Sequence, residues 1–84
     1  YYYFMMDEFI VDCTNNSIEE IQVVYKWLVE TRNYNQTYLE DDYPVIACNI
    51  KPNHSNYRSL EKACKDFPNH SVYTFKQFKK QIYK

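Results

Sequence analysis

Glycine is absent from this chain of 84 residues. The phosphate-binding P-loop and the dinucleotide-binding fingerprint both require glycine, because only a residue without a Cβ atom lets the backbone approach a phosphate closely. The serine nucleophile elbow also needs glycine on both sides of the serine. The sequence therefore excludes these three motifs, and no cofactor is predicted.

Cysteine is scarce, with three residues far apart in the sequence, Cys13, Cys48 and Cys64. An odd number of cysteines without a close pair is not typical of a disulfide framework or of a zinc knuckle. We expect reduced thiols that pack as small hydrophobic side chains, and no metal site.

Long apolar segments and a strong net charge are also lacking. No apolar run approaches the roughly 20 residues of a membrane-spanning helix, and no signal-peptide pattern is present. The formal net charge is −1, so no overall field attracts nucleic acid or anionic lipid. These features predict a soluble, cytoplasmic protein without a membrane partner.

Aromatic residues are plentiful at 19%, and ten of them are tyrosines. Exposed tyrosines are typical of protein-binding surfaces. The abundance of Tyr, Asn, Lys and Ile also matches AT-rich codons, so this composition suits a small gene of an AT-rich bacterium, a bacteriophage or another virus.

A chain of this length predicts a single domain over residues 1–84.

The hydrophobic pattern predicts strands and helices in alternation. The expected strands cover residues 9–13, 43–50 and 71–75, and the expected helices cover residues 18–31, 57–66 and 75–83. Ser17 with Glu20, and Thr74 with Gln77, have the spacing of capping boxes. The order β-α-β-α-β-α favours a small α/β domain of two or three layers with a mainly parallel sheet. An α+β arrangement with an N-terminal hairpin is the alternative.

The tetrapeptide Pro-Asn-His-Ser occurs twice, at residues 52–55 and 68–71. Its residue types are typical of turns and helix starts, so we interpret both copies as turns that precede helices. A metal site shared by His54 and His70 is the rival reading. In a parallel sheet these two histidines would lie at opposite ends of the strands, which argues against such a site.

The polar segment before the second expected strand predicts a protein interface. It supplies aromatic anchors and carboxylates for a basic partner, namely Tyr34, Tyr38, Glu40, Asp41, Asp42 and Tyr43. Our first hypothesis is a non-enzymatic protein-interaction domain. If the chain is an accessory protein of phage or virus type, its partner would be a host protein. The other possible partner is a second copy of the same chain.

Two other hypotheses remain open. If the sheet is parallel, the residues after its first two strands form one ligand-binding surface, as in a small hydrolase or nucleotide-binding enzyme. These residues are Asp12, Cys13, Asn15, Lys51 and His54. Alternatively, the C-terminal helix contacts nucleic acid through Lys76, Lys79 and Lys80, although acidic residues elsewhere oppose a polyanion.

Overall fold

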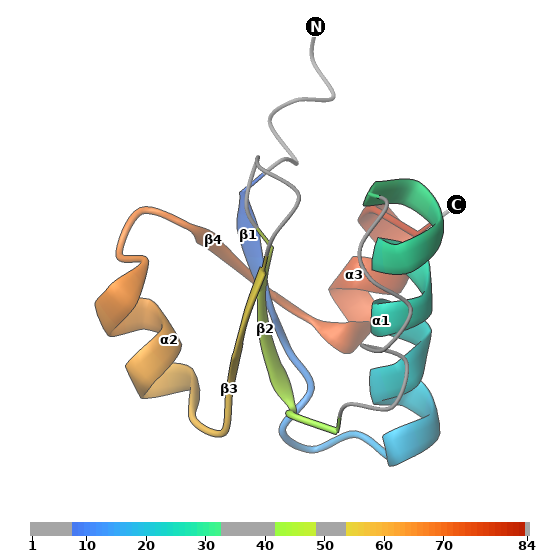
Figure 1. The fold of residues 1–84 in the computed structure, drawn as a ribbon, viewed down its shortest axis with the longest axis horizontal. Coiled ribbons are helices and arrows are strands. Elements are labelled where there is room, and N and C mark those ends of the chain that lie inside the picture. Colours follow the sequence, from blue (N-terminus) through green and yellow to red (C-terminus); the bar gives the residue numbers. More distant parts are fainter. Residues whose placement is uncertain (1–7, 33–41, 49–53, 84) are drawn as a thin grey trace, which may run out of the picture.

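The computed structural model describes residues 8–32, 42–48 and 54–83, and these residues form a small α/β domain. The elements are β1 (Phe9–Asp12), α1 (Ile18–Arg32), β2 (Val45–Cys48), β3 (His54–Tyr57), α2 (Leu60–Asp66), β4 (Ser71–Thr74) and α3 (Phe75–Gln81). Figure 1 shows three layers, with α2 on one face of the sheet and α1 and α3 on the other. The hairpin proposed for the N-terminal segment would involve residues 1–7, which lie outside the described residues.

The sheet is mixed, whereas a mainly parallel sheet was predicted. Its strand order is β3-β2-β1-β4. Only β1 and β4 run parallel, while β2 is antiparallel to both β1 and β3. The prediction was wrong because α1 was treated as a crossover leading directly into a parallel strand. Instead, β2 begins at the end of the sheet where β1 finishes, since Val45 pairs with Asp12.

The two ends of the sheet are therefore distinct, and we name them by their residues. At the Asp12 end, β1, β3 and β4 finish and β2 begins, since Asp12 pairs with both Val45 and Thr74. At the Cys48 end, β2 finishes and the other three strands begin. All three helices start near the Asp12 end because each follows a strand that finishes there.

Strand β3 was not predicted. Its sequence, His-Ser-Asn-Tyr, contains no β-branched residue and was interpreted as a turn followed by the start of a helix. It forms an edge strand by pairing with the apolar strand β2, with Tyr57 opposite Val45. Helix α2 consequently begins at Leu60 rather than at Tyr57.

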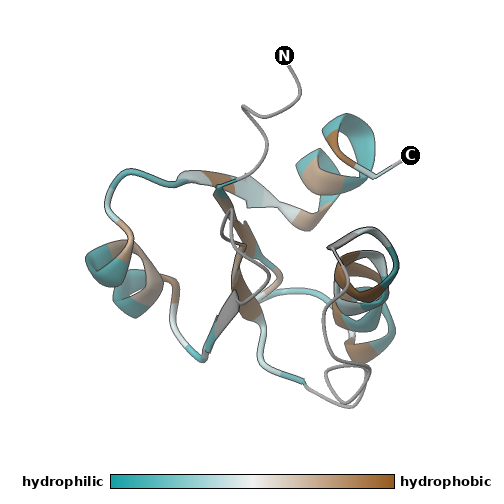
Figure 2. Ribbon diagram, turned by 45° about the horizontal axis from the view of Figure 1, so that its top comes forward, coloured by the Kyte–Doolittle hydropathy of each residue, from teal (hydrophilic) through white to brown (hydrophobic). Residues whose placement is uncertain are grey.

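Alternate residues of β1 pack on opposite faces of the sheet. Phe9 and Val11 face α1 and α3 and belong to the larger hydrophobic cluster, whereas Ile10 belongs to the cluster under α2. All four residues of β2 are buried, as expected for a strand covered on both faces. Figure 2 shows this apolar character along the central strands and the polar character of α2 toward solvent.

Helix α1 covers the larger cluster with the side chains that its periodicity predicts. Ile21, Tyr25 and Leu28 are buried there. Ile18 was expected in the same stripe but is 54% exposed. It is the first residue of the helix.

Both predicted capping boxes are confirmed. At α1, the Glu20 amide donates to the Ser17 hydroxyl and the Ser17 amide donates to the Glu20 carboxylate, each at 3.2 Å. At α3, the Gln77 amide donates to the Thr74 hydroxyl at 3.1 Å, and the Gln77 side chain accepts from the Thr74 amide at 2.9 Å. Each motif satisfies backbone groups that have no partner inside the helix.

Replacing Thr74 with alanine is expected to destabilise the fold by about 1 kcal/mol, because the cap of α3 is lost. Urea unfolding measures this change in the free energy of unfolding. Ser71→Ala, also an exposed hydroxyl of β4, is the matched control and should change it by less than about 0.5 kcal/mol. Equal effects of the two substitutions would contradict a role of the cap.

Candidate functional site

Two segments distant in the sequence meet at the Asp12 end of the sheet. The backbone amide of Cys13 donates to the carbonyl oxygen of Pro44 at 2.8 Å, which extends the pairing of β1 and β2 by one step. The hydroxyl of Tyr25, a fully buried residue of α1, donates to the carbonyl oxygen of Tyr43 at 3.1 Å. The backbone of residues 43 and 44 is thus attached to the core at two points.

On this fixed backbone, Asp42 and Tyr43 expose their side chains. Tyr43 is 38% exposed, and the Asp42 side chain is 53% exposed. Arg58, which follows β3, contacts both of them. Its Nη2 atom lies 3.5 Å from Oδ1 of Asp42, and its guanidinium carbon lies 4.2 Å from the centre of the Tyr43 ring. We call these three residues the Asp42 cluster.

Sequence reasoning identified Asp42 and Tyr43 but missed Arg58. Nothing in the sequence links Arg58 to them, because the contact depends on the antiparallel pairing of β2 with β3. That pairing sets Tyr57 opposite Val45 and so brings the residue after β3 next to the segment before β2. The other residues of the predicted interface, Tyr34, Tyr38, Glu40 and Asp41, lie outside the described residues.

The ligand-binding surface predicted after the first two strands does not form. Asp12 ends β1, whereas His54 pairs with Cys48 at the other end of the sheet. Three residue steps along the strands separate these two ends, which is about 10 Å. The prediction was wrong because it required β1 and β2 to be parallel. Lys51 lies outside the described residues.

The remaining residues of that surface have structural roles or are exposed. Asp12 ends β1 in a turn, where its Oδ1 atom accepts from the amide and the hydroxyl of Thr14. Asn15 is exposed in the same turn. Burial raises the pKa of Cys13 to about 12, with a smaller contribution from the charges of Asp12 and Glu20. A protonated, buried thiol is a poor nucleophile.

The two histidines of the repeated tetrapeptide lie at the same end of the sheet, not at opposite ends as predicted. His54 is the first residue of β3, and His70 directly precedes β4. These are the two outer strands of the sheet, so about 14 Å separates them. The His70 ring lies 4.7 Å from the ring of Phe67. Within residues 8–32, 42–48 and 54–83, no group of three or more His, Cys, Asp or Glu residues is suited to a metal ion.

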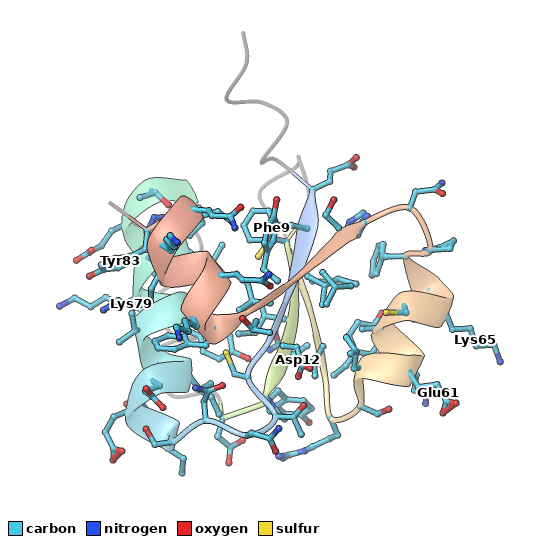
Figure 3. All side chains as sticks on the ribbon, turned by 180° about the vertical axis from the view of Figure 1, so that it is seen from behind. Phe9, Asp12, Glu61, Lys65, Lys79 and Tyr83 are labelled. Atoms are coloured by element: carbon cyan, nitrogen blue, oxygen red, sulfur yellow. The ribbon has the colours of Figure 1, made fainter. Side chains whose placement is uncertain are left out.

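The lysines proposed to contact nucleic acid are exposed on α3. Lys79 and Lys80 lie in its last turn, where cations stabilise a helix. The Lys79 ammonium lies 5.0 Å from the centre of the Tyr83 ring, and Figure 3 shows the two side chains together. Hydrogen bonds from the Ser17 amide and the Asn16 side chain lower the pKa of Glu20 on α1, and the charge of Lys79 makes a smaller contribution. A carboxylate near these lysines weakens their attraction for a polyanion.

A shallow hollow of about 580 Å³ lies on α2. Its described lining consists of Ser59, Glu61, Lys62 and Lys65, all of them exposed. Figure 3 shows Glu61 and Lys65 extending away from the sheet into solvent. This open surface does not resemble the enclosed pockets that bind small ligands.

No family model, curated protein or solved structure matches this chain. In addition, no helix in the described part of the chain has the length and apolar character needed to cross a membrane. The candidate site is therefore the Asp42 cluster at the Asp12 end of the sheet.

Proposed function

We propose that this chain is a non-enzymatic protein-interaction domain that binds a basic partner through the Asp42 cluster. One observation carries the proposal: Asp42 and Tyr43 expose a carboxylate and an aromatic ring from a backbone that Tyr25 and Cys13 hold to the core. Binding by a fixed surface costs less conformational entropy than binding by a surface that must first be ordered. Tyrosine and charged residues are also typical anchors of interfaces.

The surroundings of the cluster support a cationic partner. Glu19 and Glu20 lie in the first turn of α1, and this helix starts at the same end of the sheet as Asp42. These carboxylates also stabilise the start of the helix, so they have a structural reason to be there. Their negative charge adds to that of Asp42 and would speed the approach of a basic protein.

We further propose a cytoplasmic location and an accessory role of phage or virus type, with a host protein as partner. The support for the location is that all three cysteines are free thiols, two of them buried, as is usual in a reducing compartment. The support for the accessory role is composition alone, namely the abundance of residues with AT-rich codons.

Capture of partners from an extract of the native host tests the proposal. Asp42→Lys is expected to reduce the captured partner roughly ten-fold, because it places like charges across the interface. Tyr43→Ala should reduce it by a similar factor, because the aromatic anchor is lost. Quantitative mass spectrometry of the captured proteins gives the measurement.

Two control variants match these changes. Glu61→Lys makes the same charge reversal on α2, and Tyr83→Ala removes a tyrosine that is 38% exposed, equal to Tyr43. Both controls should capture the partner as the wild type does. If Asp42→Lys and Glu61→Lys behave alike, the Asp42 cluster is not the binding surface.

A further inference from the structure

Within the Asp42 cluster, the guanidinium group of Arg58 contacts both the carboxylate of Asp42 and the ring of Tyr43. We propose that Asp42 and Tyr43 form a binding site for an arginine side chain of the partner, and that Arg58 fills this site until the partner's arginine displaces it. This inference rests on the proposed function and names the chemistry of the partner. Arg58 would then be an internal competitor that sets the threshold for binding.

The two contacts of Arg58 suit a guanidinium group. The ring of Tyr43 lies 4.2 Å from the guanidinium carbon, within the range of cation–π contacts, and the carboxylate of Asp42 lies 3.5 Å from one of its nitrogen atoms. In general, a flat guanidinium can stack on an aromatic ring and still donate N–H groups to a carboxylate. A lysine ammonium cannot stack in this way, so the site should prefer arginine.

The internal contact is weak enough to be exchanged. The side chains of Arg58 and Asp42 are 64% and 53% exposed, and exposed ion pairs of this kind contribute little. The separation of 3.5 Å also exceeds the roughly 2.7–2.9 Å of a strong charge-assisted hydrogen bond. Carboxylate and ring therefore retain capacity for a better-placed guanidinium.

The two sides of the contact differ in how firmly they are held. The backbone beside Asp42 is attached to α1 and β1 through the carbonyl groups of Tyr43 and Pro44. Arg58 follows the end of β3, and its side chain is 64% exposed. Rotation of that side chain alone would empty the site, without rearrangement of the sheet.

Titration with a defined peptide tests this inference. The probe is an acetylated and amidated (Gly-Arg)3 peptide, and its affinity is measured by isothermal titration calorimetry at low salt. Arg58→Gln removes the competitor and is expected to bind the probe about five-fold more tightly than the wild type, as expected when a weak exposed ion pair is lost. Asp42→Asn in the same background should abolish this gain.

Matched probes and a matched variant separate the proposed competition from general electrostatics. Lys62→Gln removes one positive charge from α2 and should leave the affinity near that of the wild type. Peptides with lysine, or with the neutral isostere citrulline, in place of arginine should bind at least about five-fold more weakly to Arg58→Gln. An equal gain from Lys62→Gln, or no gain from Arg58→Gln, would overturn the inference.

The capture experiment and the peptide titration test different claims. If Asp42→Lys abolishes capture of the host partner but Arg58→Gln gains no affinity for the arginine peptide, the binding surface stands and arginine recognition falls. If Asp42→Lys leaves capture unchanged, the proposed function itself falls, whatever the peptide does.

Discussion

Replacing Phe9 with alanine is expected to lower the free energy of unfolding by about 3–5 kcal/mol. Phe9 is fully buried in the inner strand β1. Its ring centre lies 6.2 Å from that of Trp27 on α1 and 5.8 Å from that of Tyr73 on β4. Truncation would leave a cavity where three elements meet, and this loss is a large part of the roughly 5–15 kcal/mol that stabilises a domain.

Urea unfolding followed by circular dichroism and by the fluorescence of Trp27, the only tryptophan, measures this loss. Phe9→Leu keeps most of the volume and should cost less than about 1.5 kcal/mol. Tyr43→Ala removes an aromatic ring at the surface and should cost less than either. A loss below about 1 kcal/mol for Phe9→Ala would show that the ring does not occupy the core.

The thiol of Cys13 is expected to react with iodoacetamide about a thousand times more slowly than an ordinary thiol at pH 8. Burial, together with the charges of Asp12 and Glu20, raises its pKa from 9.0 to about 12, so the reactive thiolate is rarer by that factor. Cys64, which is only partly buried on α2, should be modified first. Peptide mass spectrometry after timed labelling measures the order.

The same raised pKa makes stability depend on pH in a defined window. Below pH 9 the thiol of Cys13 is protonated in both the folded and the unfolded chain, so its contribution is constant. Between pH 9 and about 12 the unfolded chain loses this proton while the folded chain keeps it. Folding is therefore weakened as the pH rises, by at most about 1.4 kcal/mol per pH unit.

Comparison with Cys13→Ala isolates this effect, because all other titrating groups are common to both proteins. The wild type should lose stability more steeply than the variant between pH 9 and 10.5. Parallel slopes in urea unfolding over this range, or labelling of Cys13 as fast as that of Cys64, would mean that the thiol is accessible in the folded protein.

Helix positions were predictable because their signals are local. The capping boxes at Ser17 and Thr74 join residues three positions apart, and both form as predicted. Phe75 and Phe78 of α3, together with Ile82 directly after it, are buried as their spacing indicates. Such contacts lie within one or two turns of a helix, so the sequence order alone brings the residues together.

Strand β3 and the Asp42 cluster were not predictable in the same way. Strand β3 contains no β-branched residue, and it forms because β2 offers a line of backbone hydrogen-bonding groups beside it. Arg58 reaches Tyr43 only as a result of that pairing. Two residues of the predicted interface, Asp42 and Tyr43, lie in the described part of the chain, and both contact a cation that no sequence pattern indicated.

By itself, the sequence excluded the glycine-dependent motifs and determined the three helices and the apolar strands β1 and β2, because these depend on residue type and short-range spacing. Only the tertiary structure decided the direction of β2, and with it which segments share an end of the sheet. Strand direction depends on backbone hydrogen bonds between distant residues, and backbone groups are the same at almost every position. For that reason the structure separates Asp12 from His54 and brings Asp42, Tyr43 and Arg58 together.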